Sequence, residues 1–326
     1  MQHPTSGKLV TIFGGSGFVG TQVVRRLARD GFRIRVVTRN PNLHLELKPL
    51  GEVGQIALVR GDVRDPAQVQ QAVRGASFVV NLVGILRPGG GQSFEDVHAS
   101  GPDAIAQACA AEGVEGLVQM SAIGADRDSN SAYSRSRAEG EAASRAAFPS
   151  AVVLRPSVIF GAGDGFFNLF ARLMRMARGF FPSFGGGSTR FQPVYVGDVA
   201  DAVSVALRAP AHKGRTFELG GPAVMSLQEI LDLIARETGR RFIYLPVPFF
   251  LLDIVSLLTG WLPFSPMTYD QAKLLRKDNV VKAGSDSAHV GTFADLGITP
   301  TPAEAIVPSY LYTYRPTGQY ADAGSV

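Results

Sequence analysis

The 326-residue sequence contains a single cysteine, Cys109, so no disulfide can form within the chain. A lone cysteine excludes the disulfide-stapled class of small secreted domains and fits a reducing compartment. Cys109 lies in the alanine-rich stretch AIAQACAAEG, where the pattern predicts a helix. We therefore expect a buried, unreactive thiol at this position.

Long runs of one residue class are also absent. No stretch of 18 uncharged apolar residues occurs, so we expect no membrane-spanning helix. No block of five like charges occurs, and we expect no nucleic-acid partner although the net charge is +4. The opening MQHPTSGK is short and polar, so we expect neither a secretory signal nor a transit peptide. No motif in the chain predicts a metal site.

The residues that are present indicate a packed α/β protein, with 45% hydrophobic and 18% charged residues. The first half alternates helical patterns with runs rich in Val, Ile and Leu, as expected for strands buried on both faces of a parallel sheet. We expect strands at KLVTIF (8–13), RIRVVT (33–38), IALVR (56–60), SFVVNLV (77–83), GLVQMS (116–121) and AVVLRP (151–156). The predicted fold is a Rossmann-type doubly wound parallel sheet with a smaller C-terminal α/β lobe.

The rhythm of the pattern changes after residue 160, and we place a domain boundary there. Residues 1–160 form the predicted dinucleotide-binding core. Residues 161–316 form the smaller lobe, which is interleaved with the core because segment 191–210 returns to it. Residues 317–326 are expected to be a loose tail.

Three helices carry start signals in the sequence. Asp65 followed by Pro66 is typical of an N-cap and first helical position. Asp198 is expected to cap a helix that stops before residue 210. Ser226, with Glu229 three residues later, predicts a capping box.

A glycine-rich turn is the strongest single motif. In VTIFGGSGFVGTQVVRRLARDG, Gly14, Gly17 and Gly20 follow a strand and open a helix. The first glycine permits a tight turn, the second allows the backbone to approach a pyrophosphate, and the third allows the helix to pack on the strand. The helix amides and dipole then face the phosphates. The spacing in this context predicts a dinucleotide site.

The end of the second expected strand, RVVTRN, indicates which nucleotide binds. NAD-specific proteins keep an acidic residue there for the ribose 2′-hydroxyl. Thr38 occupies that position here and Arg39 follows it. Because a guanidinium can hold a 2′-phosphate through charge-assisted hydrogen bonds, we expect NADP(H).

This glycine spacing resembles that of the short-chain dehydrogenase/reductase superfamily, particularly its extended and atypical branches, and the resemblance extends from residue 8 to about residue 300. The superfamily uses a serine, a tyrosine and a lysine four residues after the tyrosine for proton transfer. By resemblance these are Ser121, Tyr133 and the position held here by Arg137. Arginine keeps the positive charge but cannot shuttle a proton, and Glu141 four residues on offers it an ion pair instead. We therefore expect Tyr133 to face the cofactor without turnover.

The same resemblance implies further cofactor contacts. Asp62 and Val63, after strand three, would meet the adenine. Leu82, Val83 and Gly84, after strand four, would line the ribose and phosphate side.

Several stretches are similar to one atypical branch in particular, the nucleotide-binding accessory subunits of respiratory complex I, NADH:ubiquinone oxidoreductase. These stretches are VVNLVGIL, VHASGPDAIAQA, MSAIGADRDSNSAYSRSRAEGE, LRPSVIFGAGDGFFNLFA and GGGSTRFQPVYVGDVADAV. In that family a tightly held NADPH has a structural role, and the subunit docks on the peripheral arm near the membrane. Members often have lysine where Arg137 stands, which weakens a catalytic interpretation.

The family resemblance also implies roles for individual residues. Gly14, Ser16, Gly17, Phe18 and Val19, with Gly20 behind them, would hold the pyrophosphate, and Arg39 the 2′-phosphate. Tyr133 and Arg137 would face the nicotinamide ribose, and Pro156 and Ser157 the nicotinamide. His98 has no redox role that the sequence supports, and we expect it to be a hydrogen-bonded structural residue.

Segment 245–266, LPVPFFLLDIVSLLTGWLPFSP, is the most apolar window of the chain. Its prolines, Asp253 and Gly260 make it too interrupted to span a bilayer, but its apolar residues could lie in a membrane interface. These residues are Phe249, Phe250, Leu252, Trp261 and Phe264. Lipid, a hydrophobic partner subunit and the protein's own core all remain open. The expected location is peripheral, on the cytoplasmic face of a bacterial inner membrane, or the matrix side in a mitochondrion.

Three functions are consistent with these patterns. The first is a non-catalytic, NADPH-holding accessory subunit of respiratory complex I. The second is an NADPH-dependent reductase or epimerase-like enzyme acting on a small carbonyl or sugar-nucleotide substrate. The third is a sensor of the NADPH/NADP ratio. The arginine at position 137 and the short Ser121–Tyr133 spacing favour the first over the second.

Overall fold

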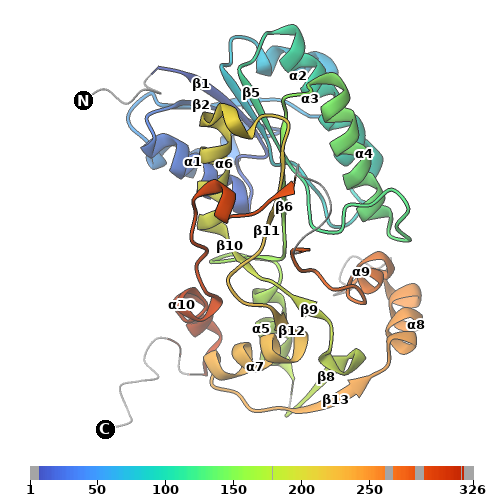
Figure 1. Cartoon of the computed structure of the whole chain (residues 1–326). Helices are drawn as coiled ribbons and strands as arrows, with labels where there is room; N and C mark the ends of the chain where they lie inside the picture. The colour runs from blue at the N-terminus through green and yellow to red at the C-terminus, as the bar shows by residue number, and fades with distance from the viewer. Residues whose placement is uncertain (1–6, 178, 261–266, 283–289, 317, 319–326) are drawn as a thin grey trace. The chain divides into compact units, whose positions relative to one another are not determined.

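The computed structural model describes residues 7–177, 179–260, 267–282, 290–316 and 318, and the chain divides into two compact units (Figure 1). The first unit comprises Met1–Pro156, Gly197–Leu219 and Lys282–Ile298. The second comprises Ser157–Val196, Gly220–Val281 and Thr299–Val326. The chain thus returns to the first unit twice, and the sequence pattern did not predict the second return.

An eight-stranded sheet forms the centre of the first unit, in the order β14-β11-β6-β5-β4-β1-β2-β3. Its strands are β1 Leu9–Phe13, β2 Arg33–Thr38, β3 Ile56–Arg60, β4 Phe78–Asn81, β5 Gly116–Met120, β6 Val152–Pro156, β11 Thr216–Leu219 and β14 Val290–Gly291. Every neighbouring pair is parallel. The strand order reverses between β1 and β4, and ligands bind beyond the carboxyl ends of the strands at such a point. The predicted α/β doubly wound fold is confirmed.

Helices cover both faces of this sheet, with α2, α3 and α4 on one face and α1 and α6 on the other (Figure 1). Their bounds are α1 Phe18–Arg29, α2 Pro66–Val73, α3 Gly101–Ala111, α4 Ala132–Ala147 and α6 Val196–Arg208. Shorter turns are η1 Pro41–Leu43, η2 Leu45–Leu50, the π-helical turn η3 Glu95–Ser100, η5 Pro210–His212 and η6 Ala294–Leu296. Apolar strand residues such as Val79 and Leu117 pack against Val69 and Ile105 of α2 and α3. Cys109 is buried in α3, as predicted, and burial raises the pKa of its thiol to about 12.

The six strands expected in the first 156 residues all form, each within two residues of its predicted bounds. Asp65 caps α2, accepting hydrogen bonds from the amides of Ala67 and Gln68, as predicted. The capping box of Ser226 and Glu229 is also present. The prediction for Asp198 is wrong, because α6 begins at Val196 and Asp198 lies inside its first turn.

The second unit is built around an aromatic core. Its helices are α5 Phe167–Met176, α7 Leu227–Glu237, α8 Phe249–Thr259, α9 Tyr269–Leu274, α10 Ala303–Ile306 and α11 Pro308–Leu311, with turns η4 Gly185–Gly187 and η7 Tyr312–Tyr314. Its paired strands are β7 Ile159–Phe160 with β10 Val194–Tyr195, β8 Phe180–Phe184 with β13 Ile243–Val247, and β9 Arg190–Phe191 with β12 Met225–Ser226. Phe160, Phe167 and Phe170 are buried among Ile230 and Ile234 of α7.

The apolar window at 245–266 forms the end of β13 and all of α8, while Trp261 and Phe264 lie outside the described residues. Leu252 is buried, so one side of α8 belongs to the core of the second unit. The other side is exposed, with Phe250 at 60%, Leu257 at 65% and Leu258 at 66% of their full accessible surface. Within the described part of the chain, no helix has the length and apolar character needed to cross a membrane.

Candidate functional site

The glycine turn between β1 and α1 has a conformation that only glycine provides. Gly14 has φ +77°, and a Cβ on it would lie 3.1 Å from the backbone of Leu82 and Val83. The amide of Gly17 donates to the carbonyl of Gly14 at 3.1 Å. A Cβ on Gly20 would overlap the carbonyl oxygen of Gly14 and lie 2.6 Å from two atoms of Gly15. Close packing of α1 on the turn therefore requires Gly20.

The start of α1 lies beside this turn without a side-chain cap. Gly17 is the N-cap residue and supplies no hydrogen bond from a side chain. The first amides of the helix are consequently available to an anionic ligand, and the helix dipole favours one.

A cavity of about 430 Å³ opens at this point, above the carboxyl ends of β1, β2, β3 and β4. It is lined by Phe13, Gly14, Ser16, Gly17, Val37, Thr38, Arg39, Asn40, Leu43, His44, Gly61, Asp62, Val63, Leu82, Val83, Gly84, Ile85 and Gln92. The glycine turn supplies its backbone-lined wall, and the loops after the other three strands supply the rest. A glycine cradle beside an uncapped helix start fits a dinucleotide pyrophosphate.

Most residues predicted to bind cofactor line this one cavity. They are Gly14, Ser16, Gly17, Arg39, Asp62, Val63, Leu82, Val83 and Gly84. Phe18, Val19 and Gly20 form the first turn of α1, just behind the lining. Ser121, Tyr133, Arg137 and Pro156 are also outside the lining set.

Ser157 belongs to the second unit, where its hydroxyl donates to Asn279 Oδ1 at 2.6 Å. Its predicted contact with the nicotinamide stays a prediction.

The loops contribute lining residues that the sequence analysis missed, namely Asn40, Leu43, His44, Gly61, Ile85 and Gln92. His44 lies between η1 and η2, with its amide donating to Pro41 and its carbonyl accepting from Leu47. Its ring Nδ1 lies 3.4 Å from Glu46 Oε1. The sequence could have identified these residues only by their position after a strand, because loops that follow parallel strands at the switch point border the same crevice.

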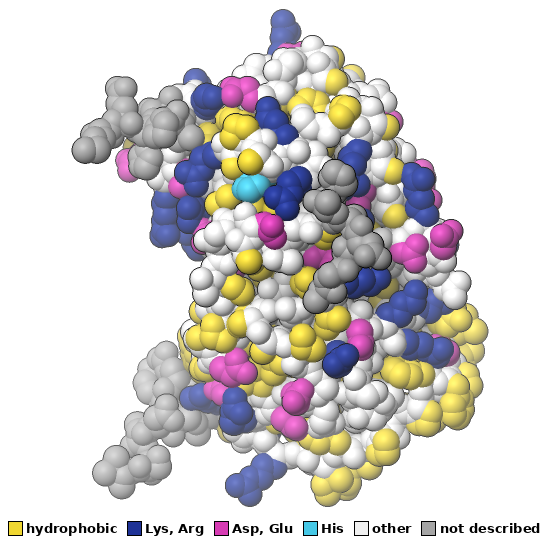
Figure 2. Space-filling model, viewed as in Figure 1, with side chains coloured by type: hydrophobic (Ala, Val, Ile, Leu, Met, Phe, Trp, Pro, Cys, Tyr) yellow, Lys and Arg dark blue, Asp and Glu magenta, His cyan; other side chains and the backbone are white. Residues whose placement is uncertain are grey.

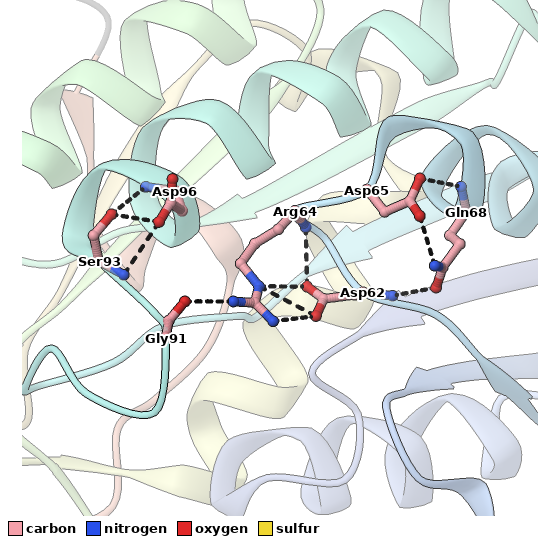
Figure 3. Close-up of polar contacts among 7 residues, drawn as sticks. All are labelled: Asp62, Arg64, Asp65, Gln68, Gly91, Ser93 and Asp96. Atoms are coloured by element: carbon pink, nitrogen blue, oxygen red, sulfur yellow. Dashed lines mark hydrogen bonds and ion pairs between the residues drawn. The ribbon is translucent and has the colours of Figure 1, made fainter.

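Asp62 is paired with Arg64 at the edge of the site (Figure 3). Arg64 Nη2 lies 2.6 Å from Asp62 Oδ2, and its Nε lies 3.0 Å from Oδ1. The hydrogen bonds from Arg64 hold the pKa of the Asp62 carboxyl below its usual range, with a smaller contribution from the charge of Arg39. Asp62 is therefore an ionised, partnered carboxylate, and a ligand at this end of the cavity meets a carboxylate that Arg64 already neutralises.

Ser121 donates its hydroxyl to Glu141 at 2.5 Å, and both side chains are buried. Arg155 binds the same carboxylate through two nitrogens, at 2.8 and 2.6 Å. Arg145 Nη1 also lies 3.7 Å from this carboxylate. The ion pair expected between Arg137 and Glu141 is wrong, because α4 directs Glu141 inward to Arg155.

Arg137 packs behind the cavity wall. Its guanidinium lies 5.2 Å from the centre of the Tyr133 ring, and Nη1 reaches the carbonyls of Val83 and Met120 at 3.5 and 3.3 Å. Its Nε is buried and has no hydrogen-bond partner. A Cβ on Gly84 would collide with this guanidinium, so Gly84 gives Arg137 room against the wall.

His98 is buried between this wall and α4. Its Nε2 accepts the amide hydrogen of Ile85 at 3.0 Å, so Nδ1 carries the proton and faces Ser136 Oγ at 3.0 Å. Its ring meets the Tyr133 ring edge-on at 5.4 Å. Burial lowers the pKa of His98 to about 2, and the charge of Arg137 adds to the effect. His98 is a neutral, hydrogen-bonded structural residue, as predicted.

No cluster of three or more metal-binding side chains occurs among the residues that the structure describes. The lining presents the backbone of the glycine turn, the Arg39 guanidinium, the Asp62 carboxylate and apolar side chains such as Phe13 and Val37. Its other polar side chains are those of Ser16, Thr38, Asn40, His44 and Gln92.

The fold and this cavity define the class of protein: the chain belongs to the NAD dependent epimerase/dehydratase family, whose pattern matches residues 10–220. It is 35% identical over 303 residues to NADH dehydrogenase (ubiquinone) 1 alpha subcomplex subunit 9, mitochondrial, of Mus musculus, a match covering 92% of this chain and 78% of that protein. It is 30% identical over 315 residues to the NADH-ubiquinone oxidoreductase 40 kDa subunit, mitochondrial, of Neurospora crassa, covering 96% and 81%. The family resemblance inferred from the sequence is confirmed.

A solved structure confirms the fold alone. The triphenylmethane reductase of Citrobacter sp. superposes with a TM-score of 0.71 at 19% identity, covering 93% of this chain and 99% of that one.

Proposed function

We propose that this protein is an accessory subunit of respiratory complex I that holds NADPH without turning it over and stabilises or helps assemble the peripheral arm near the membrane. The observation that carries the proposal is the 35% and 30% identity, over 92% and 96% of the chain, to two proteins named as subunits of this enzyme. The dinucleotide cavity supplies the site for the ligand.

The choice of NADPH rests on the loop after β2. Thr38 and Arg39 line the cavity where an NAD-specific protein has an acidic side chain. Arg39 would bind the 2′-phosphate, and the amides at the start of α1 the pyrophosphate. Bound NADPH would carry a transferable hydride on its nicotinamide ring. The chain would hold the NADPH in place and keep water away from that ring. Such binding stabilises the folded subunit by about 4 kcal/mol at a thousandfold excess over the dissociation constant.

Two features support a role without turnover. The hydroxyl of Ser121 is engaged by buried Glu141, which Arg155 holds, so it is not presented to a carbonyl substrate. Arg137 replaces the lysine of the family pattern and cannot pass a proton on. A reductase or epimerase-like enzyme would instead need Tyr133 as its acid, and a redox sensor would bind its partner differently with NADPH and NADP.

Replacing Tyr133 by phenylalanine is expected to leave NADH:quinone oxidoreductase activity in membranes within about twofold of wild type. A tyrosine that transferred the proton would cost about 10²–10⁴ in rate when its hydroxyl is removed. The measurement is activity together with the NADPH released from the assembled complex by acid. If the Tyr133→Phe complex lost its NADH:quinone oxidoreductase activity while it stayed assembled and kept its NADPH, Tyr133 would have a catalytic role.

Association with the complex is the direct test of the proposed function. A tagged chain, gently solubilised from native membranes, is expected to co-migrate with NADH dehydrogenase activity in a native gel, together with other complex I subunits. Recovery of the whole pool as a monomer separate from that activity would contradict the proposal.

The exposed side of α8 supports a peripheral position at the membrane. Figure 2 shows hydrophobic side chains gathered at the lower right, where Figure 1 labels α8, beside a group of Lys and Arg. The exposed apolar side chains are Phe250, Leu251, Ile254, Val255, Leu257 and Leu258 of α8, with Ile243 and Leu245 of β13. Helix α9 packs against α8. It carries Lys273, and Arg276 and Lys277 come just after its end. An apolar face beside cations suits the interface of an anionic bilayer, and we propose that α8 lies in it.

A pair of substitutions on α8 can distinguish a lipid surface from a protein partner. We expect the double variant Leu257→Asp/Leu258→Asp to lose binding to vesicles that contain anionic lipid and to dissociate from membranes. Val53→Asp is the matched control, because Val53 is equally apolar and fully exposed but belongs to the first unit. A double variant that still binds vesicles but leaves the complex would place a protein on α8.

The proposed location is the cytoplasmic face of a bacterial inner membrane. The single cysteine, buried in α3, fits a reducing compartment of this kind.

A further inference from the structure

Arg64 joins two separate segments at one end of the cavity (Figure 3). On one side it grips Asp62 in the turn between β3 and α2, through Nε and Nη2. On the other side its Nη1 donates to the carbonyl of Gly91 at 2.5 Å. Gly91 belongs to residues 85–92, the loop that follows β4 and is called the latch loop below.

The Asp62 side of this bridge is held in place by its neighbours (Figure 3). The amide of Asp62 donates to Gln68 Oε1 at 3.1 Å, and Gln68 Nε2 donates to Asp65 Oδ2 at 2.6 Å. The backbone amide of Arg64 also donates to Asp62 Oδ1 at 3.0 Å. Arg64 therefore projects from a turn that is already rigid.

The latch loop ends in a tight turn. Gly89 and Gln92 exchange two backbone hydrogen bonds of 3.0 Å, closing a tight turn in which Gly90 and Gly91 have φ of +58° and +74°. Immediately after the loop, Ser93 Oγ donates to Asp96 Oδ2 at 2.6 Å and accepts from the Asp96 amide at 3.0 Å. The contact from Arg64 ties the tip of the turn to the rest of the unit.

The latch loop borders the cavity. Ile85 and Gln92 at its two ends are lining residues, and so is Asp62 on the opposite side of the bridge. Arg64 itself does not line the cavity, so it acts on a ligand through these neighbours. Arg64 and Asp62 retain 32% and 21% side-chain exposure, so the bridge is accessible to water.

We propose that Arg64 is a latch: by tying the latch loop to Asp62 it closes this end of the cavity and sets the rate at which the dinucleotide leaves. The proposal rests on the dinucleotide binding proposed above and adds a positioning residue to it. The hydrogen bond to Asp62 raises the pKa of the Arg64 guanidinium, and the charges of Asp62 and Asp96 add to this.

The test is NADPH dissociation from the purified full chain, followed by nicotinamide fluorescence after mixing with excess NADP. Arg64→Ala is expected to release NADPH about tenfold faster, the factor expected for losing a charge-assisted hydrogen bond, with little change in the association rate. The dissociation rate of Arg64→Lys should lie between those of wild type and Arg64→Ala. An ammonium can pair with Asp62 but lacks the planar fork that reaches both Asp62 and Gly91. Arg60→Ala is the matched control, since Arg60 is an exposed arginine at the end of β3 outside the cavity lining.

A second readout separates a latch from general destabilisation. In the Asp62→Asn background, Arg64→Ala should have much less further effect on dissociation, because the two residues act as one unit. The ligand-free melting temperature of Arg64→Lys should match that of Arg60→Ala. Wild-type dissociation rates in both Arg64 variants, or additive effects with Asp62→Asn, would overturn the latch. Absence of NADP(H) binding by the wild-type chain would overturn the proposed function and the latch with it.

Discussion

Gly20→Ala is expected to lower the free energy of unfolding by about 3 kcal/mol or more and to abolish dinucleotide binding. The added methyl would overlap the carbonyl oxygen of Gly14 and lie 2.6 Å from the carbonyl carbon and Cα of Gly15. All three are backbone atoms of the turn, so no side-chain rotation can relieve the collision. Either α1 moves away from the turn or the turn loses its shape, and the phosphate cradle is lost in both cases.

The measurement is denaturant unfolding of the ligand-free chain, followed by circular dichroism, with dinucleotide titration alongside. Gly17→Ala is the matched control, because a Cβ there lies 3.4 Å from the Gly14 carbonyl oxygen, an ordinary contact distance, and φ is −83°. We expect this variant to unfold within about 1 kcal/mol of wild type. Equal unfolding free energies for the Gly20 and Gly17 variants would mean that α1 does not pack on the turn as described.

Arg39→Asp is expected to reverse the nucleotide preference of the chain. We expect the wild type to bind NADP(H) about a hundredfold more tightly than NAD(H), through charge-assisted hydrogen bonds to the 2′-phosphate. A carboxylate at position 39 would repel that phosphate and accept a hydrogen bond from the 2′-hydroxyl of NAD(H). NADP(H) affinity should therefore fall by about 10²–10³, while NAD(H) affinity holds or rises.

Titration calorimetry with both nucleotides measures this preference directly. Arg60→Asp makes the same change of charge at the end of the neighbouring strand, outside the cavity lining, and should leave the ratio of the two affinities unchanged. Equal wild-type affinity for NAD(H) and NADP(H) would remove the basis for assigning the 2′-phosphate to Arg39.

The two variants depend on different parts of one site. Gly20 acts through the packing of backbone against backbone, so its effect appears in the ligand-free chain. Arg39 acts through charge at the cavity wall, so its effect appears only when the two nucleotides are compared. Together they distinguish a cavity that cannot form from one that forms with a different specificity.

The sequence alone was sufficient to predict the parallel sheet, the glycine turn and the family. Each depends on local information: six apolar runs of strand length, the glycines at positions 14, 17 and 20 directly after the first run, and helix caps such as Asp65 and Ser226. Parallel strands buried on both faces read as uninterrupted apolar segments whatever their partners are. Nine of the lining residues could be named from the sequence, and five of them, Asp62, Val63, Leu82, Val83 and Gly84, were named through the family resemblance.

Only the tertiary structure decided which partners the polar side chains take. Glu141 was expected to pair along its helix with Arg137, but the packing of α4 on the sheet buries it against Arg155 of β6 and Ser121 after β5. Arg64 reaches Gly91, 27 positions along the chain, because the turns after β3 and β4 end beside the same cavity. The exposure of α8 was likewise beyond the sequence, because an apolar stretch does not reveal which of its sides the rest of the unit covers. Periodicity reports the local backbone, whereas these pairings depend on which side chains folding brings within hydrogen-bond distance.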